Sequence, residues 1–344
     1  MFHASKTFAL GLGLLVLGAA PSDQPPGPDA DGLLHLSMLA PTRLSYVGRL
    51  ESVQFGGSKS EATIYRIEHR APNLTRRWYL APQSLFGDWS LTRGSTAYNV
   101  DVKRKRIYVS TNKVLDDQVA LDDNFGLLTS NYRVLPAPPQ TVAGRVTIAL
   151  LLINKYTGQI AMRLWIDKET KLVLQKESYS SNGAVTRQLR FDEIRYTADL
   201  PAPVFQPPNL PGFTMGKGAT HHAPSNDLLS VVKAAGFSAG FPKYLPDGFL
   251  PVAGDVSDIK SIRNLHLLYS DGIRTLSLYE NALGAAVDLS RFRTQQVHFQ
   301  DYTGDFVQDG STTLLAWHDE GLHFALVGEL SRAELVKIAS SVAK

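Results

Sequence analysis

Two groups of histidines are candidates for metal binding or acid–base chemistry. His221-His222 lies in a proline-rich stretch, where adjacent side chains of an extended chain point apart and do not easily share one metal ion. His318 and His323 flank Asp319-Glu320-Gly321, which could form an acid–base cluster but is more typical of a hairpin turn between two strands. We therefore expect a solvated segment at the first group, a turn at the second, and no metal site.

Paired carboxylates and a basic run are two further candidates. Asp116-Asp117 and Asp122-Asp123 would point in different directions on a helix, so we expect a solvated helix face rather than a coupled acid–base pair. The run Lys103–Arg106 could attract phosphates or anionic lipid headgroups. It also suits an exposed hairpin turn, where basic residues discourage edge-to-edge pairing of strands, and we favour the turn.

Composition excludes several classes of function. The 344 residues include no cysteine, which removes disulfides, thiolate-bound zinc, iron–sulfur clusters and thiol nucleophiles. A formal net charge of +3 gives no large basic field for a nucleic-acid backbone. The glycine-rich, nucleophile and metal motifs of common enzymes are also missing. We predict a binding protein that is not an enzyme, with no cofactor and no nucleic-acid partner.

Aromatic and apolar side chains in the first half of the chain form the last candidate site. Trp78, Trp89, Phe125, Leu128 and Trp165 are predicted to line the inner face of a curved sheet. Core filling explains such residues, and so does a cavity that takes acyl chains. The sequence does not separate a filled barrel from an open one, and we name these five as candidate lining of a lipid pocket.

Residues 1–22 are predicted to be a signal peptide. The apolar run Phe8–Ala20 follows Lys6 and is shorter than the roughly 20 residues that a spanning helix needs. Small residues end the run just before Pro21, so cleavage is expected close to Ser22. The alternative is an uncleaved N-terminal membrane anchor. We expect an exported protein.

Residues 31–199 are predicted to form a large antiparallel sheet with covering helices. Helices are expected over Asp31–Ala40, which ends before Pro41, and over Asp116–Asn131. Short spacing between β-rich runs without intervening helices indicates antiparallel pairing. The predicted strands are Leu44–Gln54, Glu61–Arg70, Arg76–Leu80, Ser84–Arg93, Thr96–Val102, Arg106–Ser110, Thr141–Ile153, Gln159–Ile166, Leu172–Ser180 and Ala184–Tyr196.

Residues 200–224 are rich in proline and are predicted to be an interdomain linker or an extended crossover. Residues 225–344 are predicted to form a smaller α+β domain. Helices are expected over Asn226–Ala235 and Ser331–Val342, the second with a capping box of Ser331 and Glu334. The predicted strands are Leu265–Tyr269, Ile273–Glu280, Gln295–Gln300, Thr312–Trp317 and Leu322–Val327.

Several short motifs, in order along the chain, resemble the MucB/RseB family of periplasmic regulators of extracytoplasmic sigma factors. Each motif alone is weak, but their order and spacing cover nearly the whole chain after residue 22. They are Val142-Ala143-Gly144-Arg145, Arg163-Leu164-Trp165-Ile166-Asp167, Thr170, Ser181-Asn182-Gly183, Leu245-Pro246-Asp247-Gly248-Phe249, Tyr269-Ser270-Asp271-Gly272, Val327-Gly328-Glu329-Leu330-Ser331 and Leu335-Val336-Lys337-Ile338-Ala339-Ser340-Ser341-Val342.

The resemblance implies a fold and a function. The larger domain would be an unclosed antiparallel barrel like the lipoprotein carriers LolA and LolB, with helices on its concave side. The chain would act in the periplasm, bind the periplasmic segment of a membrane-spanning anti-sigma factor and shield it from regulated proteolysis. Binding of lipid, lipopolysaccharide or lipoprotein acyl chains would release the anti-sigma segment. No catalytic residues are implied.

Two other functions stay open. A lipid or lipoprotein carrier without a sigma pathway could use the same first domain, and would hold a stoichiometric acyl ligand. An exported hydrolase with a scattered active site is disfavoured by the missing nucleophile motifs.

Overall fold

The computed structural model describes residues 29–56, 60–111, 121–180, 182–197, 199–220, 225–259, 262–282, 289–290 and 292–343. The predicted signal peptide, Asp116-Asp117 and His221-His222 lie outside these ranges. Among the described residues, no helix has the length and hydrophobicity needed to cross a membrane.

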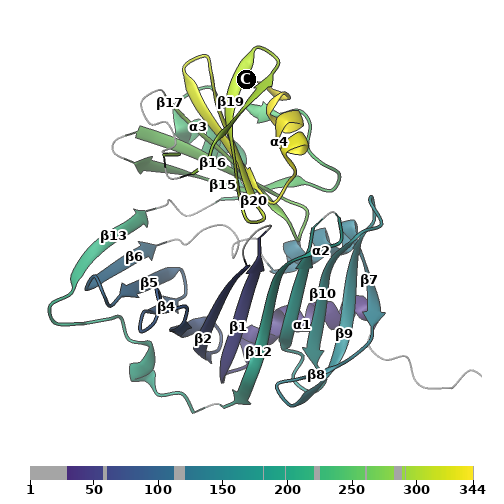
Figure 1. Ribbon diagram of the computed structural model, residues 1–344, viewed down its shortest axis with the longest axis vertical. Helices are drawn as coiled ribbons and strands as arrows, with labels where there is room; N and C mark the ends of the chain where they lie inside the picture. Colours follow the sequence, from purple (N-terminus) through teal and green to yellow (C-terminus); the bar gives the residue numbers. More distant parts are fainter. Residues whose placement is uncertain are drawn as a thin grey trace, which may run out of the picture.

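The first domain is built on one 13-stranded sheet (Figure 1). Neighbouring strands pair antiparallel, except that β13 pairs parallel with β6. The outermost strands β13 and β7 are not paired with each other, so the sheet is unclosed. The strand order is β13 (Thr214–Thr220), β6 (Arg106–Thr111), β5 (Thr96–Asp101), β4 (Trp89–Arg93), β3 (Leu74–Ala81), β2 (Ser60–Arg70), β1 (Tyr46–Phe55), β12 (Val185–Tyr196), β11 (Val173–Tyr179), β10 (Ile160–Asp167), β9 (Arg145–Asn154) and β7 (Tyr132–Ala137), with β8 (Thr141–Val142) paired to β9.

Helix α1 (Ala30–Arg43) packs on one face of this sheet. Asp29 caps its start by accepting a hydrogen bond from the backbone N–H of Gly32 at 2.6 Å. The expected break before Pro41 is wrong, because the helix continues for one more turn and the Leu44 N–H still donates to the Ala40 carbonyl at 3.1 Å. Proline removes only its own N–H. Ala40 packs with Tyr46, Leu50 and Trp165 in one apolar cluster.

The segment after residue 199 covers the opposite face near β3–β6. Tyr46 belongs to the cluster under α1, whereas its neighbour Val47 packs with Leu200 and Phe205, so the two clusters lie on opposite faces of β1. A 3-10 helix, η2 (Ala202–Phe205), and strand β13 follow in this segment. Part of residues 200–224 is therefore packed on the sheet as an extended crossover, and the position of the domain boundary stays a prediction.

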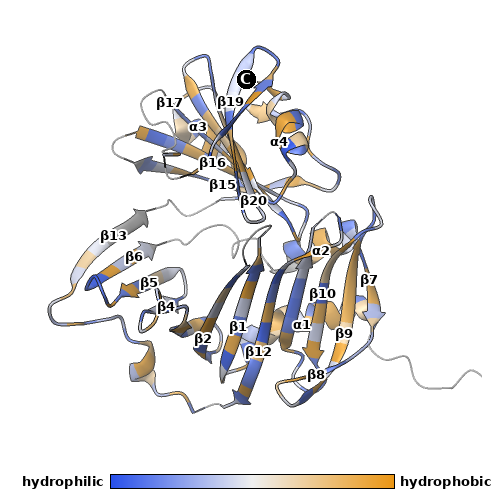
Figure 2. Cartoon of the chain, viewed as in Figure 1, coloured by the Kyte–Doolittle hydropathy of each residue, from blue (hydrophilic) through white to orange (hydrophobic). Residues whose placement is uncertain are grey.

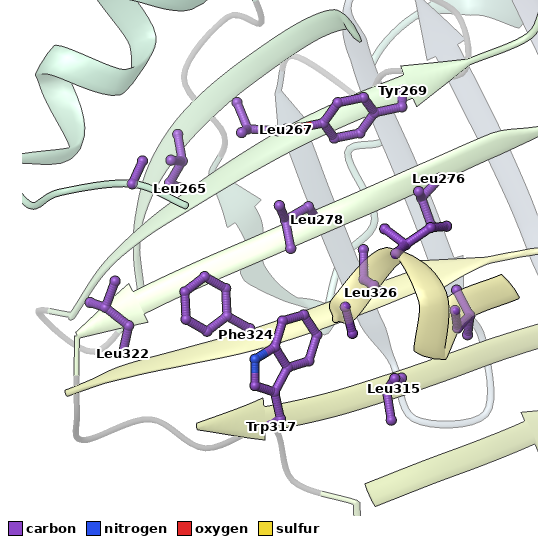
Figure 3. Close-up of a cluster of buried hydrophobic side chains, with 14 of the residues drawn as sticks. Leu265, Leu267, Tyr269, Leu276, Leu278, Leu315, Trp317, Leu322, Phe324 and Leu326 are labelled. Atoms are coloured by element: carbon purple, nitrogen blue, oxygen red, sulfur yellow. The ribbon is translucent and has the colours of Figure 1, made fainter. Parts of the chain in front are cut away.

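The second domain holds a seven-stranded antiparallel sheet. Its order is β15 (Leu250–Ile259), β16 (Ile262–Ser270), β17 (Thr275–Ala282), β21 (Leu322–Gly328), β20 (Thr312–Asp319), β19 (Tyr302–Asp309) and β18 (Gln295–Phe299). Helices α3 (Leu228–Ala235) and α4 (Arg332–Ala339) contribute to the core on one face, and β14 (Phe241–Pro242) pairs with β22 (Val342–Ala343). Figure 3 shows this core, where the rings of Trp317 and Phe324 stack at 5.0 Å.

The predicted fold class is confirmed: a large unclosed antiparallel sheet with covering helices, followed by a smaller α+β domain. The expected single strand Thr141–Ile153 is wrong. Ala143 and Gly144 have positive φ angles of 49° and 74°, which form a tight turn and divide the run into the β8–β9 hairpin. Helix α2 (Leu121–Asn131) confirms the later part of the expected helix, and residues 116–120 of that prediction lie outside the described ranges.

Candidate functional site

The five candidate lipid-pocket residues fall into three separate apolar clusters. Trp78 and Trp89 lie together, Phe125 and Leu128 on α2 join a second cluster, and Trp165 lies in the cluster under α1. Trp89, Leu128 and Trp165 are buried. The structure thus brings two pairs together and leaves the fifth residue apart.

The tryptophan pair encloses an arginine. The guanidinium carbon of Arg76 lies 4.0 Å from the centre of the Trp78 ring and 4.2 Å from that of Trp89. One guanidinium nitrogen donates to the Val204 carbonyl at 3.0 Å. Burial lowers the pKa of Arg76, although nearby Glu68 opposes this shift. This part of the first domain is filled by its own side chains and by the crossover segment.

His318 and His323 lie in β20 and β21, on either side of the expected hairpin turn, and most of the basic run lies in the β5–β6 turn. The rings of His318 and His323 face each other at 3.9 Å across the β20–β21 hairpin, and burial lowers the pKa of His323. Lys103 and Arg104 lie in the exposed β5–β6 turn, where Arg104 pairs with Asp101 at 3.1 Å. No group of three or more His, Asp or Glu side chains within the described ranges is arranged to hold a metal ion.

The site that the sequence did not identify is a polar contact between the two domains. Asp271, in the turn between β16 and β17, is 0% exposed. Its Oδ2 accepts a hydrogen bond from the Tyr132 hydroxyl of the first domain at 2.7 Å and from Arg274 Nε at 2.8 Å. Its Oδ1 accepts from the backbone N–H groups of Ile273 and Arg274 at 2.9 and 2.7 Å. A buried carboxylate with these partners is fully compensated.

Asn131, at the end of α2, adds two more hydrogen bonds across the domains. Its Nδ2 donates to the carbonyl of Gly248 at 2.9 Å and to that of Asp271 at 3.1 Å. Its Oδ1 accepts from the Tyr156 hydroxyl at 3.1 Å. Every polar group of the side chain is therefore used, which fixes its orientation.

Two glycines make the close approach possible. A Cβ on Gly272, whose φ is +96°, would lie 2.8 Å from the backbone nitrogen of Leu128 in α2. A Cβ on Gly248, whose φ is +84°, would lie 2.8 Å from the Asn131 side chain. Both positions combine a left-handed backbone with backbone or side-chain contact, so only glycine fits without strain. We call Asn131, Tyr132, Gly248, Asp271, Gly272 and Arg274 the interdomain joint.

The electrostatics of the joint favours a protonated Tyr132. Burial first, and the Asp271 carboxylate second, raise the pKa of Tyr132 above its ordinary value, so its hydroxyl stays a donor at neutral pH. A second contact lies further along the interface, where Arg187 of β12 and Glu329 approach to 3.5 Å. Glu329 also accepts from the Ser311 hydroxyl at 3.2 Å.

Comparison with known proteins identifies the first domain. Residues 95–209 match the family described as the MucB/RseB N-terminal domain. The first domain belongs to the MucB/RseB family. Residues 241–342 match a domain of unknown function, DUF4367. No curated protein matches the sequence.

Three solved structures share the fold over both domains. The complex of Pseudomonas aeruginosa MucA and MucB has a TM-score of 0.62 at 17% identity, covering 92% of this chain and 98% of that one. MucB in complex with MucA(peri) has a TM-score of 0.61 at 17% identity, with the same coverages. MucB alone has a TM-score of 0.54 at 16% identity, covering 93% of this chain and 99% of that one.

Motifs that carry the MucB/RseB resemblance in the second domain converge on the interface. Gly248 comes from the Leu245–Phe249 motif, Asp271 and Gly272 from the Tyr269–Gly272 motif, and Glu329 from the Val327–Ser331 motif. In the second domain, the sequence motifs therefore contained residues of the interdomain joint. On the other side, Asn131 and Tyr132 belong to none of these motifs.

In the first domain, the MucB/RseB motifs form a structural network instead. Asp167 is buried and pairs with Arg145. Tyr196 donates its hydroxyl hydrogen to Asp167 at 2.7 Å and accepts one from Thr170 at 2.8 Å. These contacts connect the start of β9, the β10–β11 turn and the end of β12, so they stabilise one end of the sheet.

Proposed function

We propose that this chain is a periplasmic, non-enzymatic negative regulator of an extracytoplasmic sigma-factor pathway, which binds the periplasmic segment of an anti-sigma factor. The observation that carries the proposal is the shared two-domain fold: 92% of this chain aligns with 98% of a MucB chain solved together with MucA. The MucB/RseB domain at residues 95–209 supports the same assignment.

The interdomain joint supports binding by both domains at once. It holds α2 of the first domain against the β16–β17 turn of the second through hydrogen bonds from Asn131 and Tyr132. A segment that touches both domains would then meet a surface ordered in advance. Binding to a preordered surface costs less conformational entropy than binding that must first bring two domains together.

Protection from proteolysis follows physically from such binding. A protease that starts regulated cleavage needs a free, extended stretch of backbone, and a segment held along this chain does not offer one. The chain would act in the periplasm after removal of residues 1–22, and the N-terminal sequence of material from the cell envelope tests that step.

A lipid signal would release the segment only if it prefers the partner-free state, because equal affinity for both states shifts nothing. Of the five predicted lining residues, Phe125 and Leu128 are placed best for this role. Both belong to α2 and join the apolar cluster between that helix and the sheet, and the Leu128 backbone also lies against Gly272 of the joint. An acyl chain that enters below α2 would displace the helix and weaken its contact with the second domain.

Co-elution and protease protection test the proposed function. Residues 23–344 are mixed with the periplasmic segment of the anti-sigma factor from the same organism, and we expect one complex on size exclusion. The initiating protease should then cleave the bound segment more slowly than the free one. Separate elution and unprotected cleavage would contradict the proposal. A stoichiometric acyl ligand in that case would favour a carrier.

A further inference from the structure

An open groove lies in the first domain, away from the interdomain joint. It has a volume of about 510 Å³ and is formed by strands β1, β2 and β12 with the end of β3. Ligand sites commonly fall within about 300–1,000 Å³. The lining residues are Val47, Gly48, Arg49, Arg66, Leu80, Glu193, Ile194 and Arg195.

The arginines of this groove lie where their like charges repel one another across neighbouring strands. Arg49 of β1 stands directly opposite Arg66 of β2, and Arg195 of β12 stands opposite Val47, two positions from Arg49. Like charges directly opposite each other on neighbouring strands destabilise a sheet. Arg49 and Arg66 alternate with Leu50 and Ile67, which are buried in the cluster under α1 on the other face. The arginines thus share the face turned away from α1.

The neighbouring carboxylates neutralise these charges only in part. Arg49 approaches Asp192 at 3.2 Å and Glu193 at 3.8 Å, and Arg66 contacts Glu68 at 2.6 Å. The side chains of Arg49 and Arg66 are still 48% and 60% exposed.

Arg195 adds a third charge at the groove. It is exposed and makes no ion pair within the part of the chain that the structure describes. The groove therefore presents guanidinium groups with donors to spare, and a guanidinium binds a carboxylate through two parallel hydrogen bonds.

We infer that this arginine groove docks an acidic stretch of polypeptide. Carboxylates of the bound stretch would pair with Arg49, Arg66 and Arg195, and a small apolar side chain would pack against Val47 and Leu80. The inference rests on the proposed function, since the stretch would belong to the anti-sigma segment. The groove would extend the binding surface from the joint along the first domain.

A peptide fits the groove better than a lipid does. Burial of an acyl chain is favourable only where apolar surface covers it. The apolar side chains here are Val47, Leu80 and Ile194, and Leu80 is 43% exposed. Hydrophilic residues are interspersed along β1, β2 and β12, as Figure 2 shows. An extended peptide needs no enclosed apolar cavity.

Fluorescence anisotropy with residues 23–344 tests the groove directly. One probe is a labelled synthetic peptide of alternating Glu and Ser with two Leu, and the second carries Gln in place of every Glu. The groove variant is Arg49→Gln with Arg66→Gln. The control is Arg93→Gln with Arg133→Gln, which removes two exposed arginines from β4 and β7.

We expect the acidic probe to bind the native chain and the control alike, and to bind the groove variant about tenfold more weakly. The Gln probe should bind the native chain at least as weakly. The groove variant loses the repulsion between Arg49 and Arg66 together with their partly exposed ion pairs, so we expect its urea midpoint to stay close to that of the native chain. A loss of binding therefore reports on the groove and not on folding.

Other results separate this inference from the proposed function. If the native chain and the groove variant bind the anti-sigma segment and the acidic probe equally, the groove inference is overturned and the proposed function stands. If the acidic probe needs the arginines but the native chain does not bind the anti-sigma segment, the groove stands without that partner. Equal binding of both probes overturns the inference. Binding of phosphatidylglycerol vesicles in place of the acidic probe overturns it in favour of a lipid surface.

Discussion

At the residue scale, one hydroxyl crosses from the first domain to a buried charge of the second. Tyr132 Oη lies 2.7 Å from Asp271 Oδ2, and both side chains are buried. A hydrogen bond to a charged group typically contributes about 1.5–3 kcal/mol. Arg274 would still neutralise Asp271 if the hydroxyl were lost, so the carboxylate would not become an unpaired buried charge.

We therefore expect Tyr132→Phe to lower the free energy of unfolding by about 1.5–3 kcal/mol in urea titrations. The matched control is Tyr98→Phe. Tyr98 is half-buried in the apolar cluster that contains Trp78 and Trp89, and within the described residues its hydroxyl makes no hydrogen bond that is seen. Equal effects of the two substitutions would show that the joint hydrogen bond contributes nothing specific.

His69 gives the chain a pH dependence of known sign. It is buried, with Nε2 at 2.8 Å from the Pro41 carbonyl and Nδ1 at 2.8 Å from the Thr75 hydroxyl. Burial lowers its pKa below 6.5, so the folded chain resists a proton that the unfolded chain accepts. Stability is then complete above about pH 6.5 and declines as the pH falls below that value.

Urea midpoints at pH 7.5 and 5.5 measure this effect. The native chain should lose more stability between the two pH values than His69→Gln does. The variant should keep the part of the loss that comes from His323, whose pKa is also lowered by burial. The same loss in both proteins would rule out His69 as a source of the pH dependence.

At the scale of elements, helix α4 shows half of the expected capping box. The Ser331 hydroxyl accepts from the Glu334 N–H at 3.2 Å, as predicted. The Glu334 carboxylate instead accepts from the Tyr244 hydroxyl at 3.0 Å, so it does not return to the Ser331 backbone. Leu335 and Ile338 are fully buried in the core of the second domain.

Substitutions in α4 should therefore rank by burial. We expect Ser331→Ala to cost about 1 kcal/mol and Ile338→Ala about 2–5 kcal/mol. Lys337→Ala should change stability little, since its ammonium is exposed and contacts the face of the Tyr244 ring at 3.7 Å. Thermal melts of the three variants check the order, and a larger loss for Lys337→Ala than for Ile338→Ala would contradict it.

The sequence predicted most strands but missed those with weak alternation. β7 contains Pro136 and β15 contains Pro251 and Gly254, residues that argue against a strand in a single sequence. β19 contains Gly304 and three carboxylates or amides. β7 and β15 are edge strands with one neighbour each, β9 and β16, and an edge strand tolerates proline because one row of its N–H groups needs no partner strand. β19 pairs with β18 and β20 on both sides, so tertiary pairing overrides its weak local preference.

The sequence did not predict the interdomain joint, for a different reason. Asn131 and Tyr132 end a helix and begin a strand, and their partner Asp271 lies about 140 positions further along the chain. The local sequence pattern of neither segment indicates that the two are in contact. Three of the five aromatic and apolar candidates are buried, and their role in lining a lipid pocket stays a prediction. A periodic pattern does not say which cluster each side chain joins.

At the scale of the whole molecule, the joint should hold the domains together even after the chain is cut. The exposed part of residues 206–212 lies between the buried Phe205 and strand β13. Limited proteolysis should cut first within residues 206–224 and leave two resistant fragments that elute together on size exclusion. In Tyr132→Phe the fragments should separate more readily. Early cuts within residues 141–196 would contradict this architecture.

The measurement that tests the central claim most directly is an isothermal titration of residues 23–344 with the periplasmic segment of the anti-sigma factor from the same organism. The structure predicts saturable binding by the native chain, unchanged with the Arg93→Gln and Arg133→Gln control and weakened in Tyr132→Phe, whose two domains are held together less firmly. A titration without saturable heat, together with separate elution of chain and segment, would contradict the proposal that this chain binds an anti-sigma factor.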